Sequence, residues 1–279
     1  MSTIIKTAII QFTAGPDIDA NVCVVTEYIR DAAKAGARLI TTPENTCHIR
    51  GQMREKLSSV TDEVNARVMS HFQDLAHDLG VYILVGSLSV RARPDKLANR
   101  SYLFGPAGKV PVTYDKIHLF DADVGPCGYR ESDVFVHGEK AVLTQVDDAL
   151  VGMTICYDIR FPHLYRTLAK AGAQVITVPA AFACETGAAH WESLLRARAI
   201  ENGVYIVAPA QTGTHEGGRS THGHAMIVDP WGEIIVEIHP DESGYRMADL
   251  DMGLVARVRS QIKSLSHDCP FSLESSALS

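Results

Sequence analysis

Short apolar, β-branched runs alternate with amphipathic stretches along most of the chain. The runs predicted as strands are 7–12, 39–42, 81–85, 175–178 and 204–207. Apolar residues at helical spacing predict helices over 19–35, 62–79, 162–170, 188–201 and 254–263. Strands that alternate with helices in this way are typical of an α/β fold whose strands are mostly parallel.

Two turn signals predict hairpins within the same pattern. Residues 102–104 and 110–114 flank a Gly-Pro-Ala-Gly turn, and 226–228 and 234–236 flank a turn that contains Gly232. A last strand is predicted at 245–248. No linker-like segment divides the chain, so we predict a single domain over 1–279, with a polar arm from about 270 to 279.

One segment of the chain is echoed later in the sequence. Residues 35–43, Ala-Gly-Ala-Arg-Leu-Ile-Thr-Thr-Pro, are similar to residues 171–179, Ala-Gly-Ala-Gln-Val-Ile-Thr-Val-Pro. Each reads as a helix end, a glycine, a buried strand and a proline at the carboxyl end of that strand. Two such halves facing each other would bring Glu44, just past Pro43, close to the strand that ends near Cys156. Chance similarity between two helix–strand turns is the alternative.

Composition excludes several classes of protein. The 279 residues, 46% of them hydrophobic, suffice for a large core. The formal net charge is −7 and there is no basic stripe, which argues against a nucleic-acid partner. The first residues lack the order of a signal peptide, and no apolar run approaches the ~20 residues that span a bilayer. The six cysteines show no CxxC spacing, so we expect a cytoplasmic protein without disulfides.

Cys156 occupies the most informative position in the chain. The apolar run that begins at Val151 stops at this thiol, and a polar turn and Pro162 follow it. The sequence therefore places Cys156 at the carboxyl end of a strand, where a helix begins, and open α/β sheets carry their chemistry at such ends. Helix-start N–H groups favour the ionised thiol, and the thiolate is the nucleophile. A buried structural cysteine is the alternative.

A thiol that attacks an acyl carbon needs a base and a donor for the oxyanion. Glu44 follows an apolar segment, and partial desolvation would raise its pKa into the range of a general base. Lys116 lies where charged and apolar residues interleave and is able to supply a fixed positive charge. Glu131 follows a Gly/Pro-rich loop. Taken singly, these residues also fit a capping glutamate, an exposed strand lysine and a loop carboxylate.

Histidine is the rival base, because cysteine hydrolases often pair the thiol with an imidazole. The candidates are His118, His190, His222 and His224. No pair of them has helical metal spacing with a nearby acid, so no metal site is predicted. The chain also lacks GxGxxG and P-loop motifs, and no dinucleotide or nucleotide cofactor is expected. His190 and Trp191 line a pocket or simply pack.

Seven short segments, spread over nearly the whole chain, carry a specific combination of residues. They are Pro43-Glu44, 116–121 (KIHLFD), 131–132 (ES), 152–162 (GMTICYDIRFP), 187–191 (GAAHW), 196–202 (RARAIEN) and 223–232 (GHAMIVDPWG). In this order they resemble the nitrilase superfamily of carbon–nitrogen hydrolases, in particular its Nit amidase branch. The CYDIRFP block is the most specific of them.

The resemblance implies a four-layer α-β-β-α sandwich and a Glu-Lys-Cys triad. Glu44 would be the general base, Lys116 the oxyanion stabiliser and Cys156 the nucleophile. Glu131 matches an additional glutamate that positions the lysine and the substrate amide, and the backbone N–H of Tyr157 would share the oxyanion hole. The implied reaction hydrolyses a primary amide to acid and ammonia through a thioester, with no metal or organic cofactor.

The resemblance also implies a homodimer or a dimer-based homo-oligomer, joined through helices. The helix after Cys156 and the 196–202 helix are expected at that interface. His163 stands where family members often carry glutamate, which we interpret as a surface variation. The residues between Glu131 and Gly152 are poor in family-specific positions.

The implied substrate is the amide of a small carboxylate or keto acid. Residues 220–224 and 229–232 look closer to the Nit group that acts on deaminated glutathione, whereas the sister group, ω-amidase, cleaves α-ketoglutaramate or α-ketosuccinamate. Because these substrates carry a carboxylate, a pocket cation should hold it. Arg160 and Arg198 are candidates, although Arg198 would serve subunit packing equally well. The predicted substrate-binding residues are Tyr157, Arg160, His190 and Trp191.

Three alternatives remain at this stage. A true nitrilase or an N-carbamoyl amidohydrolase would use the same triad, although the 156–162 and 187–191 segments argue against both. A non-catalytic interaction protein on this fold would be free to lose the four candidate catalytic residues, yet all are present. A Cys–His hydrolase would retain most activity when Glu44 is replaced by glutamine.

Overall fold

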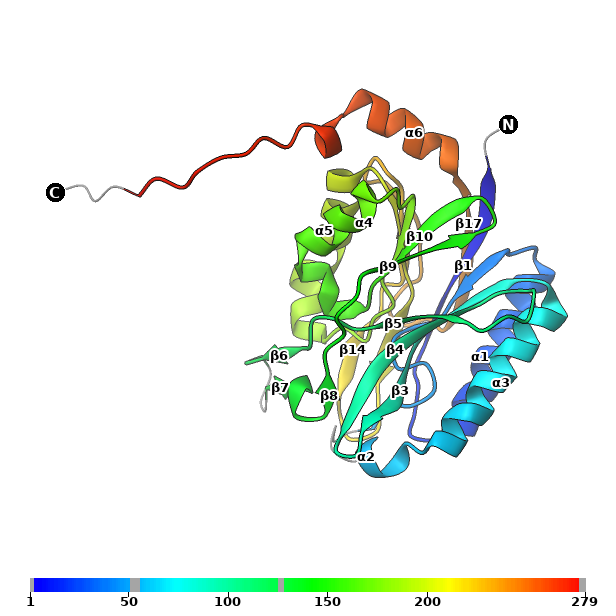
Figure 1. Ribbon diagram of the computed structural model, residues 1–279. Coiled ribbons are helices and arrows are strands. Elements are labelled where there is room, and N and C mark those ends of the chain that lie inside the picture. Colours follow the sequence, from blue (N-terminus) through cyan, green and yellow to red (C-terminus); the bar gives the residue numbers. More distant parts are fainter. Residues whose placement is uncertain (1–2, 51–55, 125–127, 276–279) are drawn as a thin grey trace.

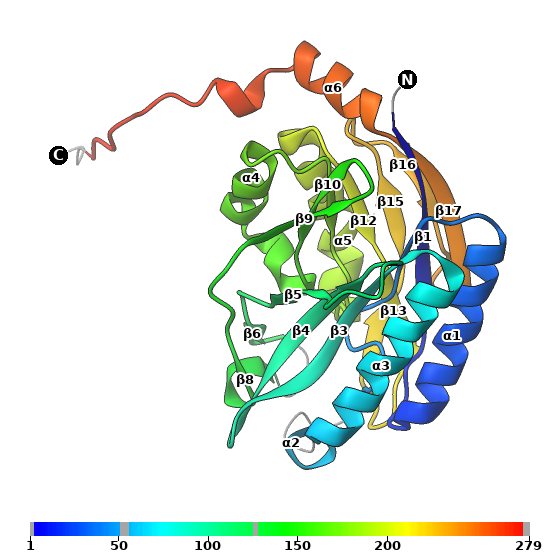
Figure 2. The same cartoon turned by 45° about the vertical axis from the view of Figure 1, so that its right-hand side comes forward.

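Two β-sheets pack face to face, and helices cover the outer face of each (Figure 1). The structure is a computed structural model that describes residues 3–50, 56–124 and 128–275. Seen from a second direction, the layers follow the order helices, sheet, sheet, helices (Figure 2). The predicted α-β-β-α sandwich is confirmed.

The first sheet has nine strands and lies under α1 (Ile18–Lys34) and α3 (Asp62–Leu79). Its strands are β1 (Ile4–Phe12), β2 (Leu39–Thr41), β3 (Tyr82–Arg93), β4 (Lys96–Phe104), β5 (Val112–Asp115), β8 (Phe135–Val136), β13 (Ala210–Thr214), β14 (Ser220–His222) and β17 (Gly244–Asp251). β1, β2 and β3 are parallel neighbours, and β4 and β5 continue the sheet in antiparallel fashion. The short helix α2 (Lys56–Ser59) precedes α3.

The second sheet has six strands and lies under α4 (Pro162–Lys170) and α5 (Cys184–Asn202). Its strands, in spatial order, are β16 (Ile234–Glu237), β15 (Met226–Val228), β12 (Tyr205–Ala208), β11 (Val175–Thr177), β10 (Ala149–Met153) and β9 (Val142–Val146). β10, β11 and β12 are parallel, so their carboxyl ends meet at one edge. The remaining elements are α6 (Met252–Gln261), the two-stranded pair β6 (Asp121–Ala122) and β7 (Tyr129–Arg130), and the 3₁₀ turns η2 (Glu131–Asp133), η3 (Cys156–Arg160) and η4 (Ser264–Ser266).

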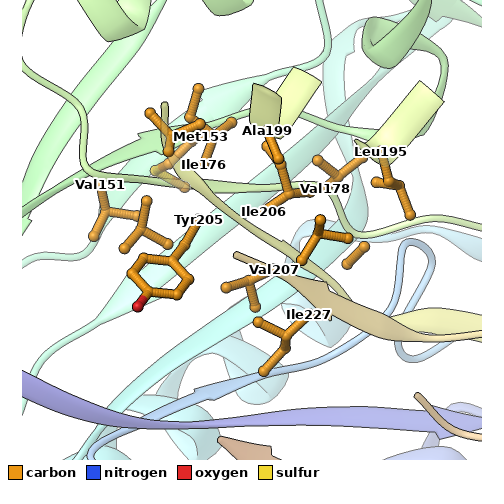
Figure 3. Packing of buried hydrophobic residues seen from close by; sticks show 14 of the residues in the cluster. Val151, Met153, Ile176, Val178, Leu195, Ala199, Tyr205, Ile206, Val207 and Ile227 are labelled. Atoms are coloured by element: carbon orange, nitrogen blue, oxygen red, sulfur yellow. The ribbon is translucent and has the colours of Figure 1, made fainter. Parts of the chain in front are cut away.

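Strand periodicity divides the core into layers. Along β1, Ile9 belongs to the core between the two sheets, whereas Ala8 and Ile10 pack against α1 and α3. In the second sheet, Tyr205 and Val207 project to one face and Ile206 to the other (Figure 3). Burying such a Val or Ile side chain contributes about 1.5–3 kcal/mol relative to leaving it exposed.

The two echoed segments occupy equivalent places in the two sheets. β2 and β11 each lie between parallel neighbours, and each follows a helix that ends just before a glycine of positive φ. Gly86 allows the chain after β2 to approach β3, because a Cβ there would lie 2.1 Å from the carbonyl oxygen of Thr42. Beyond β11, Ala180 bridges to Ala210 of the first sheet. Both strand ends therefore reach one edge of the sandwich, as the echo predicted.

Several elements differ from the sequence prediction. β3 extends to Arg93 rather than ending at residue 85, and it forms a long hairpin with β4. Its outer end is polar and exposed, and the apolar periodicity does not mark it. β9, β13 and β14 were not predicted. β10 ends at Met153, three residues before Cys156, and a 3₁₀ turn separates that cysteine from α4.

The described part of the C-terminal arm extends away from the body of the molecule (Figure 1). Phe271 and Leu273 at its end are almost fully exposed. Among the described helices, none combines the length and the apolar character needed to cross a membrane.

Candidate active site

Cys156 opens the 3₁₀ turn η3 and adopts a backbone conformation unusual for a side-chain-bearing residue, with φ +47°. Its amide N–H donates to the carbonyl oxygen of Pro179 over 2.9 Å, which ties the turn to the end of the neighbouring strand β11. The residue is buried but lines a cavity. Non-glycine residues in this region are strained, and such strain clusters at functional sites.

Glu44 is held from three directions at the end of the β2 segment. Its Oε1 accepts hydrogen bonds from Lys116 Nζ at 3.0 Å and from Asn99 Nδ2 at 2.8 Å. Its Oε2 accepts the backbone N–H of Ala181 at 2.9 Å. Ala181 lies two residues past Pro179, to which Cys156 is bonded. The carboxylate and the thiol are therefore anchored to the same short segment.

Lys116 lies between two carboxylates. Its Nζ is 3.0 Å from Glu44 Oε1 and 2.8 Å from Glu131 Oε2, and all three side chains are at least nine-tenths buried. Glu131 Oε2 also accepts the backbone N–H of Phe120 at 2.6 Å. The structure thus brings together the four residues predicted as catalytic: Glu44, Lys116, Glu131 and Cys156.

Two residues that the sequence analysis missed hold this network in place. Asn99 Nδ2 bridges the two glutamates, at 2.8 Å from Glu44 and 3.2 Å from Glu131. Asp158, fully buried in η3, accepts the hydroxyl of Tyr114 at 2.6 Å and the backbone N–H of His118 at 3.0 Å. Asp158 thereby links the turn that carries Cys156 to β5 and to the segment directly after it, which carries Lys116. Asn99 has no local sequence signal. Asp158 lies in the CYDIRFP block, but that block does not indicate its partners, which are distant along the chain.

The charges of the site differ from the sequence prediction. Burial alone would raise the pKa of Glu44, but the charge and hydrogen bond of Lys116 outweigh it and hold the pKa well below its usual range. Burial lowers the pKa of Lys116, but the charges of Glu131 and Glu44 prevail and raise it. Burial and the charge of Glu44 raise the pKa of Cys156. The resting site therefore holds a neutral thiol beside an ionised Glu44.

Two expectations are corrected by these shifts. Glu44 is not a carboxyl group with a raised pKa, because its pairing with Lys116 dominates its desolvation. Cys156 is not pre-ionised by a helix start, because η3 is a single short turn and the thiol is buried next to a carboxylate.

A cavity of about 720 Å³ opens in front of these residues, within the usual size range of a small-molecule site. Tyr157 and Phe182 form part of its wall. Of the described residues that line it, none is a histidine. His118 is instead stacked on Phe161 and bonded to Asp158, and His190 is exposed on α5. The site thus offers Cys156 no imidazole base.

The predicted substrate-binding residues divide into two groups. Tyr157 lines the cavity. Arg160 lies one layer behind the wall, with its guanidinium 5.4 Å from the ring centre of Phe182 and Nη2 3.2 Å from Nδ1 of His190. Neither Arg160 nor His190 is among the described residues that line the cavity.

Trp191 and Arg198 are structural. Trp191 is fully buried, and its indole N–H donates to the carbonyl oxygen of His224 at 2.9 Å, so the expectation that it lines the pocket is wrong. Arg198 donates Nε to the carbonyl oxygen of Ile159 at 2.8 Å and pairs with Glu201. Because those contacts occupy its guanidinium in the interior, Arg198 does not reach a substrate carboxylate.

A nucleophile, an adjacent ionised base and a fixed cation in one cavity are the parts that acyl transfer requires. The comparisons agree with this chemistry. The carbon-nitrogen hydrolase family matches residues 6–260. The deaminated glutathione amidase of Synechocystis sp. is 41% identical, over 93% of this chain and 96% of that protein.

Solved structures show the same fold. The C. elegans NitFhit protein superposes with a TM-score of 0.89 at 31% identity, covering 96% of this chain and 66% of that one. An amidase of the nitrilase superfamily from Nesterenkonia sp. superposes with a TM-score of 0.78 at 28% identity, covering 93% and 98%. In a glutamate-to-glutamine variant of that amidase, acrylamide has undergone Michael addition at the active-site cysteine.

The chain belongs to the carbon–nitrogen hydrolase family and is a hydrolase that acts on amides. Within the nitrilase superfamily its similarities fall in the Nit amidase branch.

Proposed function

We propose that this protein hydrolyses the amide of deaminated glutathione or a closely similar substrate, using Glu44, Lys116 and Cys156 as its catalytic triad. The observation that carries the proposal is the buried Glu44–Lys116–Glu131 network beside a cavity-lining thiol. The proteins named deaminated glutathione amidase, which span bacteria and mammals, support the substrate class.

The first step joins proton transfer to attack. As the substrate carbonyl approaches, the thiol proton of Cys156 moves to Glu44, with which the thiol shares a hydrogen bond, and the sulfur bonds to the carbonyl carbon. The negative charge that develops on the carbonyl oxygen is stabilised by Lys116 Nζ and the backbone N–H of Tyr157. Glu131 holds Lys116 in place.

The second step releases the amine. Collapse of the tetrahedral species breaks the carbon–nitrogen bond while Glu44 returns the proton to the leaving nitrogen, which leaves a thioester on Cys156. Water then attacks the thioester with Glu44 again as base. The carboxylic acid departs and the thiol is regenerated, and no step draws on a cofactor.

The identity of the leaving amine distinguishes the two substrate classes that the sequence suggested. Glutathione joins its γ-glutamyl group to cysteinylglycine through a secondary amide, so deaminated glutathione releases that dipeptide. The expectation of a primary amide and of ammonia release is therefore wrong for this substrate. α-Ketoglutaramate carries a primary amide and releases ammonia. Both share one acyl part, and both yield the same keto acid.

The deciding experiment measures formation of this keto acid from both substrates. Release of ammonia is measured in parallel from an aliphatic nitrile and an N-carbamoyl amino acid. We expect kcat/KM to be highest for deaminated glutathione, and Cys156→Ala to abolish turnover. Preference for α-ketoglutaramate would move the assignment to ω-amidase chemistry. Turnover of the nitrile or the N-carbamoyl compound alone would overturn the amidase proposal.

We further propose that the protein is a homodimer or a dimer-based oligomer. Ile200, Trp231 and Ile262 are each about half exposed, and all three line one apolar hollow near the C-terminal end of α5 and α6. Exposed apolar patches of this kind mark association sites. Light scattering after gel filtration should give twice the chain mass or a multiple of that mass, and Trp231→Glu should lower the measured mass. A monomeric native protein would contradict the proposal.

A reducing, cytoplasmic location completes the proposal. Five described cysteines, including Cys156, are free thiols, and an oxidising compartment would threaten a thiol nucleophile.

A further inference from the structure

Four cations besides Lys116 line the cavity. Arg130 is exposed and paired with Asp123, and the other three come from separate parts of the chain. Arg50 follows the loop that carries Glu44, Lys56 begins α2, and Arg219 lies in the turn between β13 and β14. None of the three forms an ion pair with a carboxylate among the residues that the structure describes. They are thus distinct from Lys116, whose charge two glutamates neutralise.

Hydrogen-bond donors of this cluster remain unused. The Nε atoms of Arg50 and Arg219 are buried and have no hydrogen-bond partner in the described part of the chain. Arg219 Nη2 donates to the carbonyl oxygen of Ala181 at 3.0 Å, and its guanidinium lies 5.6 Å from the ring centre of Tyr129. Lys56, only 5% exposed, donates to Asn45 Oδ1 at 2.6 Å. A guanidinium held by its neighbours with a donor left free is prepared for an external acceptor.

The contrast between the two cavity lysines, Lys56 and Lys116, also supports binding of an external acceptor. Burial and the charge of Arg219 lower the pKa of Lys56 to about 8, whereas glutamates raise the pKa of Lys116. His48, behind the cluster, has its pKa lowered to about 4 by burial and by the charges of Lys56 and Arg50. Positive charge is therefore concentrated in this part of the cavity, and the charges of Glu44 and Glu131 offset it only partly. Such an arrangement is costly unless an anion completes it.

We propose that Arg50, Lys56 and Arg219 form a carboxylate-binding subsite that recognises the anionic end of the amide substrate. The inference rests on the proposed function and deepens it, because it assigns the residues that select a charged amide over a neutral one. Guanidinium groups bind carboxylates in a fixed, bidentate geometry. These three residues line the cavity directly, whereas Arg160 lies against the rings of Phe182 and Tyr157 and is not among the described lining residues.

The recognised carboxylate belongs either to the acyl part of the substrate or to its leaving amine, and product analogues separate the two. Glutarate and pentanoate share a five-carbon chain, but only glutarate has a second carboxylate to represent the acyl part. Alanylglycine and alanylglycinamide differ only in the terminal carboxylate of a dipeptide leaving group. None of the four has to be turned over.

The measurement is protection of Cys156 from iodoacetamide, followed by peptide mass mapping so that the exposed Cys23 and Cys269 do not interfere. For each pair we compare the concentrations that protect half of Cys156. In the native protein, we expect the ratio of these concentrations to be at least ten, either for pentanoate over glutarate or for alanylglycinamide over alanylglycine. Lys56→Gln and Arg219→Gln should reduce that ratio toward one. Arg257→Gln, which removes an exposed positive charge on α6, should retain it.

A ratio near one for both pairs in the native protein would overturn the subsite, as would an unchanged ratio in both variants. The native comparison needs no substitution, so it decides even where a variant fails to fold, which circular dichroism would detect. In one further outcome, protection of Cys156 depends on Lys56 and Arg219 and yet the native protein fails to hydrolyse deaminated glutathione. That result would uphold the subsite and reject only the proposed substrate.

Discussion

Replacing Glu44 by glutamine is expected to lower kcat for amide hydrolysis by about 10²–10⁴-fold, the usual contribution of a positioned general base. The ionised carboxylate is the group placed to take the thiol proton of Cys156, and a neutral amide cannot accept it. Glutamine also fits the site poorly. Its amide has one acceptor oxygen, whereas Lys116 and Ala181 donate to opposite oxygens of the carboxylate.

Steady-state kinetics and the rate of Cys156 alkylation measure this effect. Glu192→Gln is a matched control, because it removes an exposed carboxylate from the surface of α5 and should leave kcat unchanged. Retention of most activity by Glu44→Gln would favour a histidine base. That result would conflict with the positions of His118 and His190 outside the described cavity wall.

Replacing Lys116 by methionine is expected to abolish turnover and to lower the free energy of unfolding by about 3–5 kcal/mol, as when one partner of a buried ion pair is removed. Methionine keeps an unbranched side chain, one atom shorter than that of lysine, but leaves Glu44 and Glu131 as two buried carboxylates without their paired cation. Part of the loss will be relieved as the glutamates take up protons. Thermal or urea unfolding of the variant and of the native protein measures this loss of stability.

The pH dependence provides a second readout of the same change. The depressed pKa of Glu44 in the folded state stabilises the native protein above the unfolded pKa of about 4.3, and this contribution is lost as pH falls toward the folded pKa. In Lys116→Met the cause of the depression is absent. The variant should therefore lose less of its remaining stability between pH 5 and pH 3 than the native protein.

A double variant separates charge burial from catalysis. Lys116→Met combined with Glu131→Gln removes one of the two uncompensated charges, so it should recover part of the stability and none of the activity. Unchanged stability in Lys116→Met would show that the network does not contribute as the geometry indicates.

Much of the site was accessible from local sequence. The run from Val151 to Cys156 placed a thiol near the end of a buried strand, and the echo of 35–43 in 171–179 brought Glu44 to the same edge. Such inferences succeed because apolar periodicity and turn residues record which segments are buried and where they end. The roles of Lys116 and Glu131 came from family resemblance, since each alone fits an ordinary surface residue.

The tertiary structure alone decided how these groups act on one another. Asn99 and Asp158 join the site through partners distant along the chain, and Trp191 is buried in the core although it belongs to a family motif. The direction of the Glu44 pKa shift depended on a lysine 72 positions away, which reversed the effect of burial. The local pattern of apolar residues contains no information about contacts between residues that lie so far apart in the chain. The sequence by itself therefore determined the layers and the location of the Cys156 thiol. Charge states, hydrogen-bond partners and the cationic wall follow from how two sheets bring distant residues together.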